Sequence, residues 1–139
     1  MEIREKAETL MEEMMENVID WRRHLHCHPE LSFEEFDTAD FIAEKLRAMG
    51  YEVTCNVGGT GVTASFDSGS PGPVIAFRAD MDALPILEET GLPYESDKAG
   101  IMHACGHDGH MAILLGTAHD SRTSNWCHRH QSRLSICYG

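Results

Sequence analysis

The chain has 139 residues, enough for one domain with a hydrophobic core, and its composition of 42% hydrophobic and 24% charged residues excludes a disordered tail. Its net charge of −12 argues against nucleic acids and membrane surfaces as partners, because both attract surfaces rich in Lys and Arg. No run reaches a transmembrane length, and the acidic, amphipathic N-terminus lacks the regions of a signal peptide, so we expect a cytoplasmic protein.

Two helices are expected first. Apolar residues over positions 3–25 recur at spacings of three and four, which predicts an amphipathic helix with a Met-rich stripe in the core. A second helix is predicted over residues 33–49, where Ser32 and Glu35 have the spacing of a capping box and Gly50 is the stop. Its expected buried residues are Phe36, Ala39, Ile42, Ala43 and Leu46.

Three strands are expected next, over residues 51–57, 61–67 and 73–85, separated by the turn sequences GGTG and SGSPG. Residues 74–77 are continuously apolar, as expected of a central strand buried on both faces. A buried helix then begins at MAILLGTA, with Asp108 as its expected N-cap. This order predicts an α/β domain, and ligands of such domains bind at the carboxyl ends of strands, where RADMDALP lies.

The segment HACGHDGH, residues 103–110, places several metal-ligating residue types within eight positions. Cys and His are preferred ligands of zinc and similar ions, and the glycines permit the tight turn that would bring Cys105 and His107 to one ion. His110 lies one helical turn from His107, and Asp108 could accept a hydrogen bond from a ligand imidazole. The alternative is a His-rich loop that binds no metal.

Two further groups of polar residues are candidates. Asp80 and Asp82 alternate along an extended strand and so lie on one side of it, facing either a binding cleft or solvent. His24, His26 and His28 do not share one helix face, so we expect surface or capping residues, although His28 could reach a pocket beside the turn at Pro29.

The cysteines are odd in number and contain no CxxC pair, which in a cytoplasmic chain predicts free thiols, any special one being a ligand or a nucleophile. They are Cys27, Cys55, Cys105, Cys127 and Cys137.

Four stretches follow one another from about Trp21 to Ala118: RRHLHCHPELSFEEFDTADFIAEKLRAMGYEV, GGTGVTASF, GPVIAFRADMDALPILEETGLPYES and GIMHACGHDGHMAILLGTA. Together they resemble the N-terminal part of the M20-type metallopeptidases, in the amidohydrolase branch that includes hippurate hydrolase and N-acyl-amino-acid hydrolases. The resemblance implies a catalytic domain with a central sheet flanked by helices, which a smaller lid or dimerisation domain interrupts in complete members.

The resemblance also implies the chemistry. Members of this branch use two divalent ions, often Mn, Zn, Co or Ni, to hydrolyse the amide of small N-acyl amino acids. Their metal ligands correspond to Cys105 and His107, and Asp82 takes the position that orients an active-site group. His103 and His110 become neighbours of the site. The resemblance also leaves open a homo-oligomer of the complete family member.

The resemblance ends at Ala118. Family members continue with an adjacent Glu-Glu pair, one residue the general base and the other a ligand, whereas residues 119–139 contain no Glu. We therefore expect residues 1–118 to be the N-terminal part of a catalytic domain, truncated before the lid domain, and residues 119–139 to be an aberrant tail unrelated to the family. A frameshifted or prematurely ended gene would produce such a change, and the chain alone is expected to be inactive.

Two other interpretations stay open. The chain could be a non-catalytic fragment with residual metal affinity. It could also be a small metal-binding protein that uses its Cys/His-rich segments, although their spacing in the tail fits no zinc-finger pattern. The tail residues in question are Cys127, His128, His130 and Cys137; neither these His residues nor His119 stand in the family's context.

Overall fold

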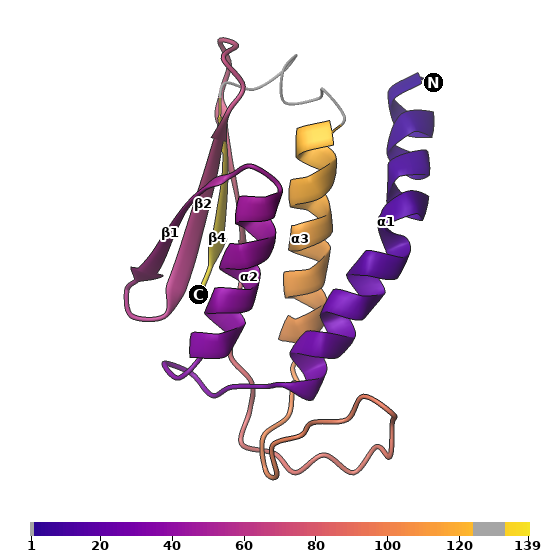
Figure 1. The fold of residues 1–139 in the computed structure, drawn as a ribbon, viewed down its shortest axis with the longest axis vertical. Helices are drawn as coiled ribbons and strands as arrows, with labels where there is room; N and C mark the ends of the chain where they lie inside the picture. The colour runs from indigo at the N-terminus through magenta and orange to yellow at the C-terminus, as the bar shows by residue number, and fades with distance from the viewer. Residues whose placement is uncertain (1, 124–132) are drawn as a thin grey trace.

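A computed structural model describes residues 2–123 and 133–139 of the chain. Within these residues three helices and four strands follow one another, as Figure 1 shows. Their order is α1 (Glu2–Cys27), α2 (Phe36–Ala48), β1 (Glu52–Val57), β2 (Gly61–Asp67), β3 (Val74–Ala79), α3 (His107–Thr123) and β4 (Arg133–Tyr138). None of the described helices is long and apolar enough to cross a membrane.

The strands form one mixed sheet in the order β1-β2-β4-β3. Strand β2 pairs antiparallel with both β1 and β4, whereas β3 and β4 run parallel, with Ala79 beside Tyr138. The carboxyl ends of β3 and β4 therefore lie side by side at one end of the sheet. This α/β sheet with packed helices agrees with the predicted fold class.

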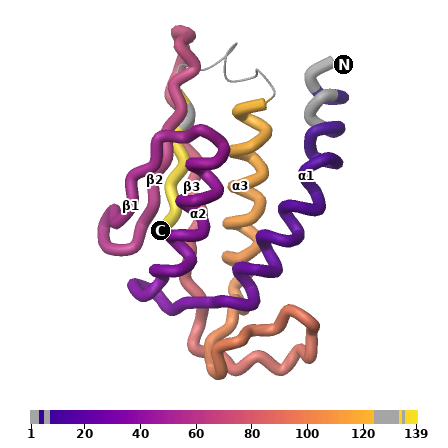
Figure 2. The backbone as a smooth tube through the Cα atoms, viewed as in Figure 1, coloured from indigo at the N-terminus to yellow at the C-terminus, as the bar shows by residue number. Residues whose placement is uncertain are grey.

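The helices form layers beside the sheet. Helices α2 and α3 stand next to it and α1 packs along α3, farther from the strands (Figures 1 and 2). Alternate strand residues, such as Val62 and Ala64 on β2 and Ile136 on β4, are buried, as expected of a sheet with one covered face. The largest fully buried apolar side chains are Leu25, Ile42, Leu46, Met81, Met111, Leu115, Ile136 and Val62.

Strand β3 differs from its prediction. It pairs only with β4 and forms an edge of the described sheet, and Val74 and Phe77 are 61% and 38% exposed. A continuous apolar run predicts burial on both faces, but burial needs neighbours that no described element supplies on this side. The prediction of a central strand is therefore wrong for the sheet described.

The start of α2 also differs from its prediction. The expected capping box of Ser32 and Glu35 is absent, because Glu35 makes no side-chain cap. The carboxylate of Glu30 caps the helix instead and accepts hydrogen bonds of 3.3 and 2.8 Å from the backbone N–H groups of Asp37 and Thr38. The cap therefore comes from Glu30, two positions before Ser32, the N-cap residue that the pattern indicated.

Several apolar side chains that were expected in the core are exposed. Met14 is buried, but Met11 and Met15 on the same helix are not, so the Met-rich stripe is only partly core. Phe36, at the first position of α2, is also exposed. The other four expected core residues of α2 are buried, which confirms the helical pattern there.

The tail contributes regular structure. Helix α3 continues past Ala118 to Thr123, and β4 lies inside the sheet between β2 and β3. Ile136 and Tyr138 face the core, so a period-two pattern is present but too short to stand out in the sequence. Cys127, His128 and His130 fall outside the described residues, and the division of the chain at residue 118 stays a prediction. The four cysteines that are described are free thiols, as expected.

Candidate metal centre

Two aspartates follow β3 at the point where it ends. Asp80 and Asp82 line an open cavity of about 520 Å³, together with Tyr138 and Gly139 at the end of β4. Because the two strands are parallel, both deliver their carboxyl ends to this cavity. Its position agrees with the rule that ligands of α/β sheets bind beyond the carboxyl ends of strands.

The imidazole of His107, the first residue of α3, is held by Asp82. Its Nδ1 atom lies 2.9 Å from the backbone oxygen and 3.0 Å from Oδ1 of Asp82. Both oxygens accept hydrogen bonds, so Nδ1 carries the proton and Nε2 keeps a free lone pair in the neutral ring. Carboxylates and carbonyl groups hold metal-ligating histidines in this way.

A thiol and a second carboxylate lie beside this imidazole. The Sγ atom of Cys105 is exposed and 3.8 Å from the same backbone oxygen of Asp82. Oδ2 of Asp80 is 3.9 Å from Nε2 of His107, while its Oδ1 pairs with Arg78 at 2.7 Å. Within the part of the chain that the structure describes, Cys105 and His107 do not join a third residue in a compact group of ligand atoms.

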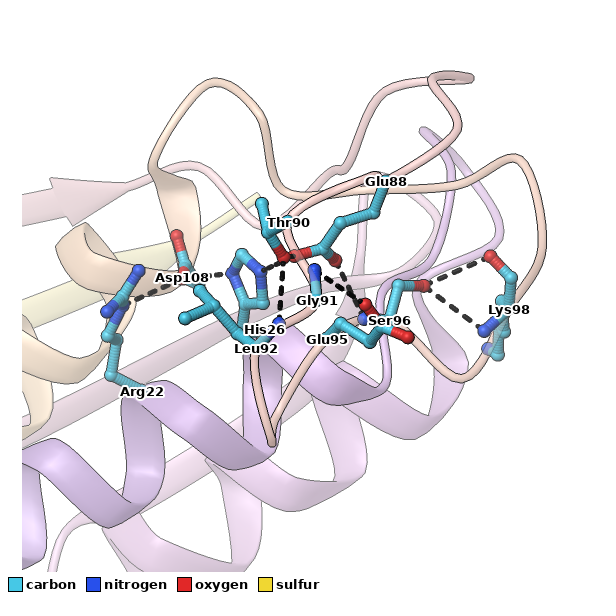
Figure 3. A network of polar contacts seen from close by, with 10 residues as sticks. All are labelled: Arg22, His26, Glu88, Thr90, Gly91, Leu92, Glu95, Ser96, Lys98 and Asp108. Atoms are coloured by element: carbon cyan, nitrogen blue, oxygen red, sulfur yellow. Dashed lines mark hydrogen bonds and ion pairs between the residues drawn. The ribbon is translucent and has the colours of Figure 1, made fainter.

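A buried polar network lies behind this site and connects α1, α3 and the loop before it (Figure 3). The His26 ring is enclosed by two carboxylates: its Nδ1 is 2.8 Å from Asp108 and its Nε2 is 3.0 Å from Glu88. Arg22 donates a further hydrogen bond to Asp108 at 3.0 Å. Both ring nitrogens of His26 therefore lie within hydrogen-bond distance of a carboxylate oxygen.

Glu88 receives hydrogen bonds from three directions. Burial raises the pKa of this carboxyl group, but hydrogen bonds from the Thr90 hydroxyl, the Ser96 backbone N–H and His26 outweigh burial and lower the pKa to about 2. The carboxylate is therefore ionised throughout the physiological pH range. The hydrogen bonds of Glu88 hold the loop of residues 88–96 over the end of α1 (Figure 3).

His103 is buried, and both of its ring nitrogens lack a hydrogen-bond partner among the described residues. Burial lowers its pKa to about 4, against an opposing effect of Asp108 and with smaller contributions from His26 and His107. The ring is therefore neutral near pH 7. His103 is therefore an uncharged, buried side chain at the start of the HACGHDGH segment.

The structure brings together some predicted residues and separates others. Asp82, Cys105 and His107 gather at the end of β3, and the ring of His110 lies 5.9 Å from that of His107 but is exposed. Asp108 is not the N-cap of α3, because the helix begins at His107 and the Asp108 carboxylate points to α1. That carboxylate accepts its imidazole hydrogen bond from His26 and not from a predicted ligand.

His26 is the main correction among the histidines. It was expected at the surface or in a cap, but it is 4% exposed and bonded to two carboxylates. His24 and His28 are exposed, as expected. Nothing in the local pattern singled out Arg22 or Glu88, because a contact between distant segments leaves no periodic signal.

Comparison with known proteins finds a family that is similar to this part of the chain. Residues 76–133, which contain the β3 aspartates and the whole HACGHDGH segment, match the description "Peptidase family M20/M25/M40". Over these residues the chain is similar to that family. The chain is 51% identical over 115 residues to the N-acyl-L-amino acid amidohydrolase of Geobacillus stearothermophilus, an alignment that covers 83% of this chain and 31% of the relative.

Two further relatives agree. The hippurate hydrolase of Campylobacter jejuni is 51% identical over 94 residues, which cover 68% of this chain and 24% of the relative. The crystal structure of Bacillus subtilis YXEP, described as a dinuclear metal-binding peptidase of family M20, superposes with a TM-score of 0.84 at 40% identity and covers 91% of this chain and 35% of that one. The chain thus spans about a third or less of the length of these relatives.

Proposed function

We propose that this chain is the N-terminal part of the catalytic domain of a metal-dependent amidohydrolase that cleaves the amide bond of N-acyl amino acids such as hippurate. The observation that carries the proposal is the His107 imidazole, held at Nδ1 by Asp82 next to the Cys105 thiol at the end of β3. Relatives named for this activity match the same chain at about 50% identity. A cytoplasmic location and a homo-oligomer of the complete protein belong to the proposal.

The residues present fit divalent ions. Cys105 offers an exposed sulfur and His107 a free Nε2, and these donor types suit Zn, Co, Ni or Mn, so we assign both residues as ligands. Two ions per complete site are expected, as in the relative described as dinuclear. Bound ions of this kind polarise a carbonyl group and lower the pKa of water.

Other residues of this chain hold and orient the His107 ligand. Asp82 fixes the proton of His107 on Nδ1 and so presents Nε2 as a ligand atom, and we assign it as the supporting residue of the site. The buried pair of His26 and Asp108 holds the first turn of α3 against α1 and so fixes where that imidazole stands. The open cavity beside Asp80 is large enough for a small acyl amino acid.

Residues 119–139 contain no Glu, so neither member of the Glu-Glu pair that the resemblance implies comes from them. We therefore expect the 139-residue chain to show no turnover alone, with the remaining groups supplied by sequence that corresponds to the rest of the relatives' length. Turnover of hippurate by the purified chain with Mn²⁺ or Zn²⁺, if abolished by Cys105→Ala, would contradict this expectation.

A graft tests the proposed function directly. Residues 1–118 of this chain replace the aligned N-terminal segment of the Geobacillus amidohydrolase, and hydrolysis of N-acetyl amino acids and hippurate is measured with added Mn²⁺, Co²⁺ or Zn²⁺. We expect the graft to be active, Cys105→Ala and His107→Ala to remove at least about 99% of the rate, and Cys55→Ala, a thiol on β1, to retain it. A second graft that carries residues 1–139 should be inactive if the tail is foreign to the family.

The outcomes separate cleanly. A folded 1–118 graft that binds metal but hydrolyses no N-acyl amino acid would contradict the proposed function. Equal activity of the 1–118 and 1–139 grafts would contradict the division of the chain at residue 118 and leave the activity itself supported.

A further inference from the structure

A group of potential metal ligands lies at the end of α1, outside the HACGHDGH segment. One ligand atom each from Cys27, His28 and Asp97 lie within 4.8 Å of one another, and this is the sole group of three such residues among those described. The three offer a thiol, an imidazole and a carboxylate, the donor types found in zinc sites. None of them takes part in the proposed amidohydrolase site.

The backbone already holds these ligands together. The N–H group of Asp97 donates a hydrogen bond of 2.8 Å to the backbone oxygen of Cys27, which fixes the loop of Asp97 to the last residue of α1. Nδ1 of His28 lies 2.7 Å from Oδ2 of Asp97. The ligands therefore come from two segments 69 residues apart in sequence, and their backbone positions do not depend on a bound ion.

The distances suit an ion after a small adjustment. Tetrahedral zinc, with bonds of about 2.0–2.3 Å to nitrogen, oxygen and sulfur, holds its ligand atoms roughly 3.5 Å apart. The ion would replace the proton shared by His28 and Asp97, and the two side chains would separate by somewhat less than an ångström. Both side chains are nearly half exposed, at 44% and 48%, so solvent gives access and rotation meets little resistance.

The surroundings leave room for a fourth ligand. His28 and Asp97 line a cavity of about 260 Å³, whose wall also includes His24. The centre of the His24 ring lies 4.7 Å from that of His28. Three protein ligands and one position open to water or a further imidazole match zinc sites that keep an exchangeable position.

We propose that Cys27, His28 and Asp97 form a second, independent zinc site that joins the end of α1 to the loop of residues 96–98. The thiolate favours Zn²⁺ or Co²⁺ over Mg²⁺ and Ca²⁺, which prefer all-oxygen ligand sets. This inference does not rest on the proposed function, and its test uses a chain in which that site is disabled.

The test measures metal binding by thiolate. The 139-residue chain is prepared with Cys105→Ala and Cys127→Ser, which leaves Cys27, Cys55 and Cys137 as thiols. Titration with Co²⁺ should give a thiolate-to-cobalt charge-transfer absorption that saturates at one equivalent, and one equivalent of Zn²⁺ should remove it. Adding Cys27→Ser should abolish the band, whereas Cys55→Ser should retain it, because Cys55 is equally half-buried but contacts Arg47.

A second variant guards against a folding defect. Asp97→Asn removes one carboxylate from an exposed position and should lower the affinity for Co²⁺ at least about tenfold, with an unchanged circular dichroism spectrum. The absence of a band in the parent chain would overturn the proposal. So would a band that survives Cys27→Ser, or an affinity unaffected by Asp97→Asn.

Discussion

Two polar clusters meet at the first turn of α3, and they differ in how completely their groups are paired. Behind the turn, the carboxylates of Asp108 and Glu88 are buried and bonded to His26, with Arg22 completing the network. In front of it, Cys105 is exposed, and among the described residues the Nε2 atom of His107 has no partner closer than a carboxylate 3.9 Å away. Neighbours in sequence thus serve opposite purposes.

The difference teaches where stability and binding reside. A buried charge is tolerated only when it is paired, and removal of one partner leaves the other desolvated. An exposed ligand atom with a free lone pair adds little to folding but is available to an ion. We call Arg22, His26, Glu88 and Asp108 the rear cluster, and Asp82, Cys105 and His107 the front cluster. The rear cluster should therefore determine whether the chain folds, and the front cluster should determine which ion it binds.

The largest effect is expected at the rear cluster. Asp108→Ala removes the buried partner of Arg22 and one of the two carboxylates bonded to His26, and it should lower the free energy of unfolding by about 3–5 kcal/mol. Urea denaturation of the 139-residue chain measures it. Asp120→Ala is the control. Asp120 lies on the same helix, and its carboxylate makes one long contact of 3.5 Å with His119, so this substitution should change the free energy of unfolding by less than about 1 kcal/mol. Equal effects of both substitutions would contradict the comparison.

This network also marks the limit of what the sequence could predict. The helices and the β1–β2 pair follow from local periodicity and turns, and the gathering of Asp82, Cys105 and His107 follows from short spacings and a strand end. The partners of His26 are 82 and 62 residues away, so no local pattern could reveal its burial. These two contacts between a ring and a carboxylate depend on how α1 packs against α3 and against the loop of Glu88, which only the folded chain defines.

The sheet edge teaches a related point. The apolar run of β3 correctly predicted a strand, but the position of a strand within a sheet depends on its neighbours and not on its own composition. Strand β4 was missed because only Ile136 and Tyr138 among its described residues alternate into the core, and two positions carry too little pattern. The cap of α2 was misassigned because Ser32 and Glu35 have the spacing of a capping box. The side chain that accepts the hydrogen bonds at the helix start belongs to Glu30.

The second expected effect concerns pH. The folded-state pKa of Glu88 lies below its ordinary value of 4.5, at about 2, so its contribution to stability is present above pH 4.5 and is lost as the pH falls toward 2. This contribution is on the order of 3 kcal/mol at neutral pH. Glu88→Gln should flatten the dependence of unfolding free energy on pH across this window. Glu89→Gln, at the exposed neighbouring position, should leave the curve as it is; a wild-type slope in Glu88→Gln would refute the assignment.

The third effect appears in metal affinity. Asp82→Asn weakens the acceptor that fixes the Nδ1 proton of His107 and should lower the affinity of the front cluster for Co²⁺ by about 10–100-fold. Asp40→Asn, at an exposed position on α2, should leave the affinity unchanged. Both are measured by Co²⁺ titration in a chain that carries Cys27→Ser, so that the site at the end of α1 does not contribute. An unaltered affinity in Asp82→Asn would remove Asp82 from the positioning role.

The smallest effect is expected for Cys105. Its side chain is exposed and makes one long hydrogen bond of 3.8 Å, so Cys105→Ala should change the free energy of unfolding by less than about 0.5 kcal/mol. Urea denaturation in the presence of a metal chelator measures this effect on the metal-free chain. A loss comparable with that of Asp108→Ala would show that the front cluster also holds the fold together.

The most direct test of the account is a Co²⁺ titration of the chain with Cys27→Ser and Cys127→Ser, followed by absorption spectroscopy with and without Cys105→Ala. We predict a thiolate-to-cobalt band that vanishes on Cys105→Ala and weakens on His107→Ala, while circular dichroism shows the fold retained in every variant. A band that is unchanged by Cys105→Ala would contradict the claim that the exposed side of the HACGHDGH turn is the metal-binding side.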